Sequence, residues 1–492
     1  MSEPLHPGSK EDFINNLPDE KLAEIFKWLP IRERFRLSRV CRRWSRIRPT
    51  CITTFDSACC RKMTLPRMGV LAKRFRSLRQ AFIRNREKDM LENKIVCKGV
   101  LSLCGLYLRC LTLRDFSSTC VVELISQTPN LQHLRIMGDN LSVKRLEKVA
   151  GLLPSLRSLE LNLSSQATKL SVKYNALSRM EGEVISKCHK LEYLSLGNSS
   201  KTHKEFLFPA NLKYLDLRYA NGRSNYYLKQ AVRYCKNVEA IHLPFVYEPC
   251  EKTLQFLGQV SGLTFLAIYF HTMYFQRHPE PFSRFCSRLS HLRALELCSA
   301  NVTTLSEISR CCKQLEHLSF HIFQIGITDD NWTEVLSLAA LPKLCSLSII
   351  LMHFNKTQYT EFFSSLAAKG NLQYIKVTTY HSSRTLIPVE SVCELLQSCK
   401  ELQYIDLDID NENGDSYTKL CQTVDKIEEM DRDLAPASRR NGLAAQIKVC
   451  KNMPEVEKYK WLHFMKRVPR SPIHTKWQWG CLSAGKPKWF DE

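Results

Sequence analysis

A six-residue pattern of apolar and variable positions recurs through the middle of the chain. It consists of an apolar residue, two variable residues, a second apolar residue, one variable residue and a third apolar residue. The pattern occurs 12 times at intervals of 21 to 35 residues. The copies begin at Leu108, Leu131, Leu156, Leu191, Leu212, Val238, Leu263, Leu292, Leu315, Leu344, Leu372 and Leu402. The alternation at the end of each copy predicts a short strand with one buried face.

The segments between the copies have the apolar spacing of helices. Two examples are Val121, Leu124 and Ile125 between the first two copies, and Val392 and Leu395 near the last. One strand and one helix bury too little apolar surface alone, whereas a stack of such repeats buries a continuous core. The pattern in residues 97–415 therefore predicts an α/β fold. We expect a curved solenoid of about 12 repeats, with parallel strands inside and helices outside.

A second feature of the repeats is a Cys or Pro two or three residues before the first apolar position. Instances are Cys188, Cys235, Cys312, Cys399, Pro129, Pro154 and Pro342. With this feature, residues 97–415 resemble the leucine-rich repeat family, and in particular its cysteine-containing subclass. The resemblance implies a protein-binding solenoid.

Residues 11–50 have a different pattern, which predicts two or three short helices. Pro18 suits the first turn of a helix, and Pro30 ends that helix. The apolar stripes of the two main helices are Leu22, Ile25, Phe26 and Leu29, then Leu37, Val40, Cys41, Trp44 and Ile47. A segment this short has too small a core to be securely stable, so we expect its apolar faces to continue onto a partner. The alternative is a helical cap on the repeat array.

The same segment resembles the F-box motif. Leu17-Pro18, Ile25-Phe26, Leu29, Leu37-Ser38 and the run from Val40 to Trp44 carry the resemblance, whereas Arg32 to Phe35 departs from it. The resemblance implies a non-catalytic substrate-recognition subunit of an SCF-type E3 ubiquitin ligase, which binds a Skp-type adaptor and through it a cullin, and promotes ubiquitination and degradation of a protein target. By this resemblance the adaptor-binding residues are Leu17, Pro18, Leu22, Ile25, Phe26, Leu29, Leu37, Val40, Cys41 and Trp44.

The variable positions between the apolar strand positions are expected to face the concave side of the solenoid. The predicted target-binding residues there are Arg114, Arg135, Tyr193, Tyr214, Asp216, Arg218, Phe265, Tyr269, His317, Tyr374, Lys376, Tyr404, Asp406 and Asp408. Exposed aromatic residues and arginines are typical anchors of protein interfaces. The alternative is that these side chains only shield the strand backbone. Charge also changes along the array, from arginines early to aspartates late.

The net charge of +22 is concentrated outside the repeats. Residues 61–98 contain 12 Lys/Arg against 3 Asp/Glu, and residues 439–492 contain 12 against 4, whereas residues 99–438 contain 36 against 34. Nucleic-acid binding by the repeats therefore lacks its simplest support. Residues 51–96 are predicted to be a basic helical linker, with Leu71, Phe75, Leu78 and Phe82 at helical spacing. Residues 416–492 are predicted to be a cap or a disordered basic tail containing tryptophan, although basic and aromatic residues together also suit single-stranded nucleic acid.

We find no pattern typical of an enzyme. The chain has no phosphate-binding glycine loop, and neither Cys59-Cys60 nor Cys311-Cys312 has a second pair at zinc spacing. No catalytic residue, cofactor or metal site is predicted. Without an export signal or a long apolar run, we expect a cytoplasmic or nuclear protein with reduced cysteines. The alternative function is a leucine-rich repeat scaffold that binds protein or RNA without a ligase.

Overall fold

The structure is a computed structural model of the chain. It describes residues 14, 17–27, 29, 36–37, 40–51, 54–56, 78–84, 98–99, 101–138, 143–163, 179–196, 206–217, 224–246, 251–270, 279–298, 302–321, 329–351, 355–379, 387–402, 404–409, 422 and 444–449.

Strands and helices alternate along most of the described chain. The strands are β1 (Thr54–Asp56), β2 (Gln80–Arg84), β3 (Cys110–Arg114), β4 (His133–Gly138), β5 (Ser158–Leu163), β6 (Tyr193–Leu196), β7 (Tyr214–Asp216), β8 (Ala240–Val246), β9 (Phe265–Phe270), β10 (Ala294–Cys298), β11 (His317–His321), β12 (Ser346–Leu351), β13 (Tyr374–Thr379), β14 (Tyr404–Ile409) and β15 (Ala444–Val449). The helices are α2 (Asp19–Lys27), α4 (Arg42–Cys51), η4 (Gly105–Tyr107), α7 (Ser118–Ile125), α8 (Val143–Leu152), α9 (Arg179–Ser186), α10 (Ser224–Tyr234), α11 (Glu251–Leu257), α13 (Pro279–Ser287), α14 (Val302–Cys311), α15 (Asp329–Leu336), η5 (Ser337–Ala340), α16 (Lys356–Lys369) and α17 (Val389–Ser398).

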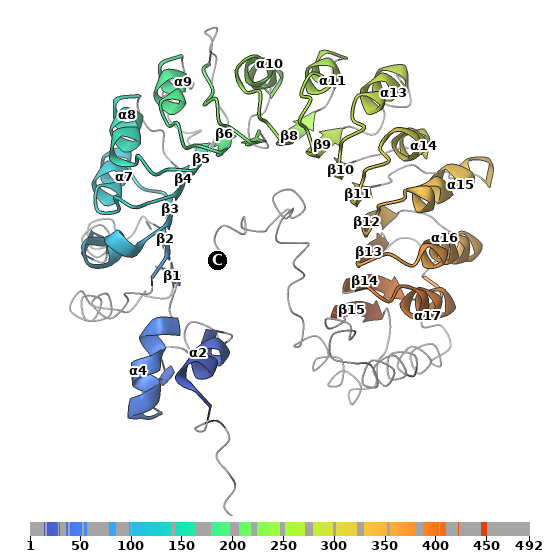
Figure 1. Ribbon diagram of the computed structural model, residues 1–492, viewed down its shortest axis with the longest axis horizontal. Helices are drawn as coiled ribbons and strands as arrows, with labels where there is room; N and C mark the ends of the chain where they lie inside the picture. The colour runs from blue at the N-terminus through green and yellow to red at the C-terminus, as the bar shows by residue number, and fades with distance from the viewer. Residues whose placement is uncertain are drawn as a thin grey trace, which may run out of the picture. The chain divides into compact units, whose positions relative to one another are not determined.

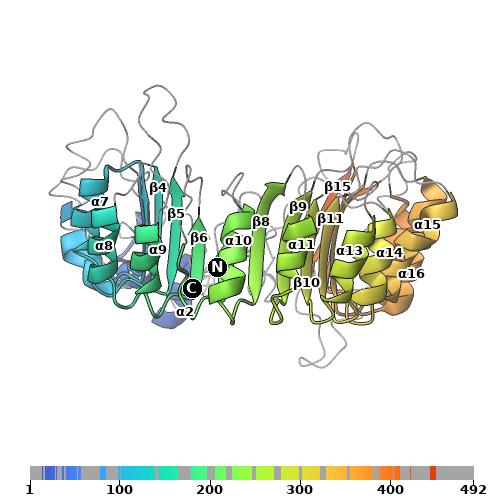
Figure 2. The ribbon, with the colours of Figure 1, turned by 90° about the horizontal axis from the view of Figure 1, so that it is seen from above.

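The chain divides into two compact units. The first consists of residues 1–193 and 198–206, and the second of residues 194–197 and 207–492. In the first unit, β1 to β5 pair side by side in sequence order, and all pairs are parallel. In the second, β7 to β15 pair in the same way. Within each unit the helices that alternate with the strands, from α7 onwards, lie along one face of the strands (Figures 1 and 2). We call the opposite face the helix-free face.

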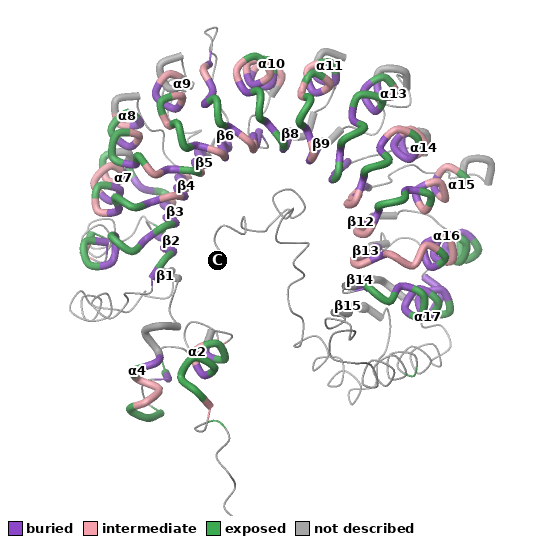
Figure 3. Tube along the Cα trace, viewed as in Figure 1, coloured by how far each residue is buried: buried purple, intermediate pink, exposed green. Residues whose placement is uncertain are grey.

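The strands β3 to β14 correspond one to one with the 12 copies of the apolar pattern. The apolar positions of these copies are buried wherever the structure describes the side chain (Figure 3). Leu111 and Leu113 of β3, for example, are each 0% exposed. Burial of one such side chain contributes about 1.5–3 kcal/mol, so regular burial over many repeats stabilises the stack. The predicted repeat fold of parallel strands and helices is confirmed.

Backbone hydrogen bonds join each repeat to the next just before the strands. The carbonyl of Arg109 accepts from the N–H groups of Gln132 and His133, at 2.8 and 2.9 Å. The carbonyl of Arg293 accepts in the same way from Glu316 and His317, at 2.8 and 3.0 Å. One carbonyl accepts from two consecutive N–H groups of the following repeat. These hydrogen bonds, which lie just N-terminal to the strands, help to fix the register between neighbouring strands.

The cysteines noticed in the repeats lie in the turn that leads into the strand. The carbonyls of Cys188, Cys312 and Cys399 accept from the N–H of the leucine three residues later, at 2.9, 3.1 and 3.1 Å. Burial raises the pKa of Cys235, in the same repeat position, to about 12. Such a thiol stays protonated and acts as a small apolar side chain. The 12 cysteines whose side chains the structure describes are all free thiols.

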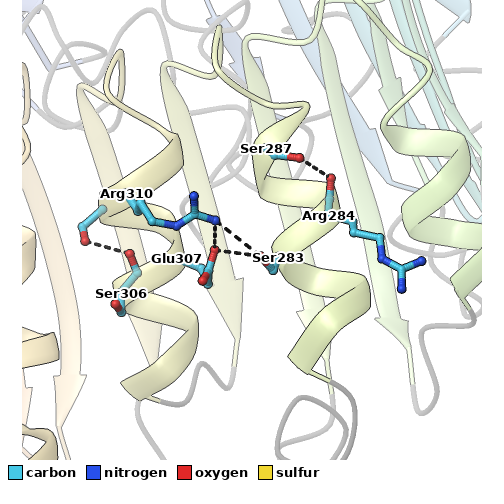
Figure 4. Close-up of polar contacts among 7 residues, drawn as sticks. Ser283, Arg284, Ser287, Ser306, Glu307 and Arg310 are labelled. Atoms are coloured by element: carbon cyan, nitrogen blue, oxygen red, sulfur yellow. Dashed lines mark hydrogen bonds and ion pairs between the residues drawn. The ribbon is translucent and has the colours of Figure 1, made fainter.

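Polar side chains connect consecutive helices, which lie on the face of the strands opposite the helix-free face. In Figure 4, Ser283 of α13 donates to Glu307 of α14 at 3.0 Å, and Arg310 donates to the same carboxylate at 2.6 Å. The hydrogen bond from Arg310 holds the pKa of Glu307 below its usual range. The longest described helix, α16, has a capping box between Asn355 and Gln358 at its start. Within the described residues, no helix combines the length and the apolar character needed to cross a bilayer.

Three of the described strands lie outside the range predicted for the repeats. The first two, β1 and β2, lie in the predicted linker, and β15 lies in the predicted C-terminal segment. Where the sequence suggested helical spacing through Leu78 and Phe82, residues 80–84 form a strand. Leu78, Ala81 and Ile83 are buried at the three apolar positions of the repeat pattern. The pattern escaped notice there because alanine replaces leucine at its second position. Leu71 and Phe75 lie outside the described residues.

Candidate protein-binding surfaces

The N-terminal helices enclose a small core of their own. Leu22, Phe26, Leu37 and Ile47 are between 0% and 5% exposed and form one cluster. The rings of Phe26 and Trp44 lie with their centroids 4.7 Å apart at an angle of 57°. The aromatic contact holds α4 against α2.

A polar contact from Arg43 supports the same pair of helices. Its Nε donates to Asp19 at 2.7 Å, and one of its terminal nitrogens donates to the carbonyl of Leu17. Asp19 is the first residue of α2, where a negative charge is favourable to the helix dipole. The start of α2 is thus held against α4.

Two large apolar side chains, Ile25 of α2 and Val40 in the turn before α4, point away from the core. Ile25 is 47% exposed and Val40 is 59% exposed, and Ile14 at the N-terminal side is 52% exposed. Leu17, Leu29 and Trp44 are half-buried against the core. A domain this small that leaves several aliphatic side chains in solvent has apolar surface suited to a partner.

A second candidate surface is the helix-free face of the repeats in the second unit. The strand register places Tyr214, Ala240, Phe265, Ala294 and His317 in one row across β7 to β11. The same row continues through Ser346 and Tyr374 to Tyr404. The next row contains Asp216 at one end and Lys376 and Asp406 at the other. The structure therefore places most of the predicted target-binding residues of this unit in two adjacent rows.

Comparison with known proteins identifies the N-terminal part. A family model described as F-box-like matches residues 14–48. Residues 14–48 form an F-box-like domain. A stretch of 31 residues, 6% of this chain, is 61% identical to the human F-box/LRR-repeat protein 12, and it covers 10% of that protein's length. Among solved structures, a crystal structure of a TLR13–ssRNA13 complex aligns with 68% of this chain and 44% of its own chain, at 15% identity and a TM-score of 0.31. The chain combines an F-box-like domain with a leucine-rich-repeat-like parallel sheet.

The predicted adaptor-binding residues divide into two groups within the F-box-like domain. Leu22, Phe26 and Leu37 belong to its core. Those on the surface or partly covered are Leu17, Pro18, Ile25, Leu29, Val40, Cys41 and Trp44. Contact of the second group with an adaptor stays a prediction, and the first group can support it only indirectly, by maintaining the helices.

The predicted target-binding residues also differ in burial. Arg114, Tyr214, His317, Tyr374 and Lys376 are partly exposed. In contrast, Tyr193, Asp216 and Phe265 are 4%, 4% and 3% exposed. Arg218 lies outside the described residues, and the structure gives no side-chain description of Tyr269, Tyr404, Asp406 or Asp408. Target binding by all of these residues stays a prediction.

The burial of Phe265 has a local cause. Its side chain packs with Ala240, Ala267 and Ala294, and Tyr214 covers the edge of this cluster. Because alanines on both neighbouring strands leave room for a ring, Phe265 lies against the sheet rather than standing out from it. A row of aromatic residues in the sequence therefore does not by itself give a row of exposed rings.

Several polar side chains of the helix-free face were missed by the sequence analysis. Glu160, His242 and Glu296 stand between the last two apolar positions of their copies, and they are 3%, 5% and 9% exposed. Glu160 pairs with Arg135, with 2.9 Å between Oε1 and Nε. Their position in the pattern was the signal that could have found them, because the same rule identified Arg135 and Asp216.

His133 of β4 is another buried polar residue, and the effect of its burial on stability can be tested by changing the pH. Burial lowers its pKa to about 4, and the positive charge of Arg157 adds to the effect. The unfolded chain takes up the proton near pH 6.5, whereas the folded chain does so only near pH 4. Folding stability should therefore fall as the pH drops through this window, at up to about 1.4 kcal/mol per pH unit. Urea unfolding at pH 7 and at pH 4.5 measures the loss.

The control for this prediction is His133→Gln, which cannot take up the proton. Its stability should fall less between the two pH values than that of the wild-type chain, by about 2 kcal/mol. An equal fall in both proteins would mean that His133 does not contribute to the acid sensitivity.

Proposed function

We propose that this chain is the substrate-recognition subunit of an SCF-type E3 ubiquitin ligase. In this proposal the F-box-like domain binds a Skp-type adaptor, and through it a cullin, while the repeats bind a protein target and bring it to the ubiquitin-transfer machinery. The chain itself acts as a non-catalytic adaptor. It would work in the cytoplasm, the nucleus or both.

The observation that carries the proposal is the F-box-like match over residues 14–48. The exposed Ile25 and Val40 support it, since they leave apolar surface on a domain whose own core is already formed by Leu22, Phe26 and Leu37. Such a surface is buried at low cost by a partner with a complementary apolar groove. The repeats add a long face of strand-borne side chains, which suits binding of a protein rather than chemistry on a small molecule.

Reconstitution tests the proposal directly. The purified full chain is mixed with a Skp-type adaptor and a cullin carrying its RING subunit, and the mixture is separated by size-exclusion chromatography. We expect all components to elute together, and ubiquitin transfer onto proteins captured by the repeats to require the chain. If the chain elutes apart from the adaptor at micromolar concentration, the ligase assignment fails and the scaffold without a ligase becomes the better explanation.

A further inference from the structure

Two arginines meet one aspartate at the end of neighbouring strands in the first unit. Arg84 and Arg114 are the last residues of β2 and β3 and are register partners. The Nε atoms of both lie near Oδ2 of Asp115, at 3.2 and 3.5 Å. The side chains of Arg84, Arg114 and Asp115 are 43%, 39% and 44% exposed. Exposed ion pairs of this kind contribute little to stability, so a ligand can displace one at little cost.

The backbone at Asp115 is unusual. In the described part of the chain, Asp115 is the only residue other than glycine with a positive φ, at 61°. Its N–H donates to the carbonyl of Met137 in β4 at 2.8 Å, which holds the turn in place. Left-handed conformations cost energy in residues with a side chain, although aspartate and asparagine tolerate them best. The turn fixes the carboxylate between the two guanidinium groups.

A third arginine lies on the next strand. Arg135 of β4 pairs in register with Thr112, two residues before Arg114 on β3. Its side chain is 19% exposed, and its ion pair is with Glu160. Among the described residues, Arg114 and Arg135 make no polar side-chain contact besides these two carboxylates. A guanidinium has five N–H donors, so each keeps donors for a ligand.

The charges of this cluster favour an anion. Arg84, Arg114 and Arg135 carry three positive charges, and Asp115 and Glu160 carry two negative charges, which leaves a net charge of +1. Planar guanidinium groups match the two oxygens of a carboxylate or a phosphoryl group, and each such pair forms charge-assisted hydrogen bonds. Because Asp115 and Glu160 already hold these arginine side chains, the arginines lose less conformational freedom on binding a ligand than mobile side chains would.

We propose that Arg84, Arg114 and Arg135, which we call the arginine cluster, bind an acidic segment of the protein target. The segment offers either several carboxylates or a phosphorylated side chain, since both present the same paired oxygens. This inference rests on the proposed function, because it specifies the chemistry of the target that the repeats bring to the ligase. Asp115 orients the guanidinium groups and competes with the ligand, so that weakly acidic sequences bind poorly.

Binding of two labelled peptides to the full chain tests the proposal. One peptide consists of glutamates, and the other has the same length, with phosphoserines among glycines. Fluorescence anisotropy should show binding of at least one, and the tighter of the two identifies the source of the anion. Arg114→Gln should weaken that binding by about tenfold or more, because it removes charge-assisted hydrogen bonds. Arg114→Lys, which keeps the charge and loses the planar fork, should give an intermediate affinity.

The matched control is Arg109→Gln. Arg109 stands just before β3, at the other end of the strand from Arg114, and its exposed side chain donates to the carbonyl of Asn130 at 3.0 Å. Replacing it removes the same charge from the same repeat, so a purely long-range effect of charge would weaken binding in both variants. We expect the affinity of the Arg109 variant to stay within about twofold of wild type, because salt screens charges beyond about 10 Å.

The variant Asp115→Asn is the most discriminating test, because it should raise peptide affinity rather than lower it. Asparagine tolerates the left-handed turn, and the change removes the competing charge. Peptide binding should become about threefold tighter or more, whereas a purely structural ion pair predicts no gain in binding.

The proposal is overturned if both peptides bind the wild type no better than they bind the double variant Arg84→Gln and Arg114→Gln. Adaptor copurification is measured on the same protein preparations. Intact adaptor binding without peptide binding refutes the arginine cluster alone, and peptide binding without adaptor binding refutes the ligase assignment alone.

Discussion

Replacing Ile25 and Val40 together by aspartate is expected to abolish capture of the Skp-type adaptor. Both side chains are exposed, at 47% and 59%, so the charges cost the free chain little. On binding, each would be transferred from water into an apolar interface, and burying an unpaired charge costs several kcal/mol. Two such changes should weaken adaptor binding by at least about 100-fold. Biolayer interferometry with the purified adaptor measures the loss, and circular dichroism checks that the helices remain.

Two further variants separate contact from folding. Leu106→Asp is the matched control, because Leu106 is 61% exposed in η4, outside the F-box-like domain. It should leave adaptor affinity unchanged. Phe26→Ala removes a core side chain that packs on Trp44, so it should lose adaptor binding together with the helical structure of the domain. If the Ile25 and Val40 double variant binds like wild type, the surface that these two side chains expose is not the adaptor surface.

The sequence could predict the repeat fold because the apolar pattern and the strand coincide. A strand with one buried face requires alternation, and each of the strands β3 to β14 satisfies it with large aliphatic or aromatic residues. In β2 the same geometry uses Ala81, which is buried at 3% exposure but too small to stand out in a sequence. Close packing tolerates a small residue where a neighbour fills the space, and that neighbour is not visible in a linear pattern.

The exposed face of the F-box-like domain was harder to predict than the domain itself. Leu22, Ile25 and Phe26 all belong to one apolar stripe, yet only Ile25 is exposed. The helix α4 covers only part of this stripe. The packing of Trp44 on Phe26 determines which part is covered. A helical pattern gives the width of an apolar stripe, whereas the packing of a second helix decides what remains for a partner.

The predicted target-binding face shows the same limit. The rule of intervening positions selected Tyr214, Phe265 and Tyr374, and the strand register lines these three residues up in one row. The rule could not give their exposure, because this depends on the residues one strand away. Likewise, Arg135 and Glu160 are neighbours in space but lie 25 positions apart in the chain, so their ion pair became visible only with the register.

Replacing Gly105 by alanine is expected to destabilise the first unit strongly. A Cβ at this position would lie 2.0 Å from the backbone oxygen of Gln127 and 2.9 Å from its carbonyl carbon. Gln127 belongs to the turn after α7, where its N–H donates to the carbonyl of Leu124 at 3.2 Å. Backbone atoms held in a turn cannot move aside as a flexible side chain can. Overpacking at such a contact costs about 3 kcal/mol. Thermal unfolding followed by circular dichroism should show the loss.

The matched control is Gly151→Ala in α8, where a Cβ would meet nothing within 4 Å. Alanine there should stabilise the helix by about 0.5–1 kcal/mol, because glycine loses more backbone freedom on folding. The same chemical change is thus expected to have opposite signs at the two positions, both in the first unit. A similar melting temperature for the two variants would mean that η4 can move away from the following repeat, and that contacts between successive repeats are looser than the close approach of Gly105 to Gln127 implies.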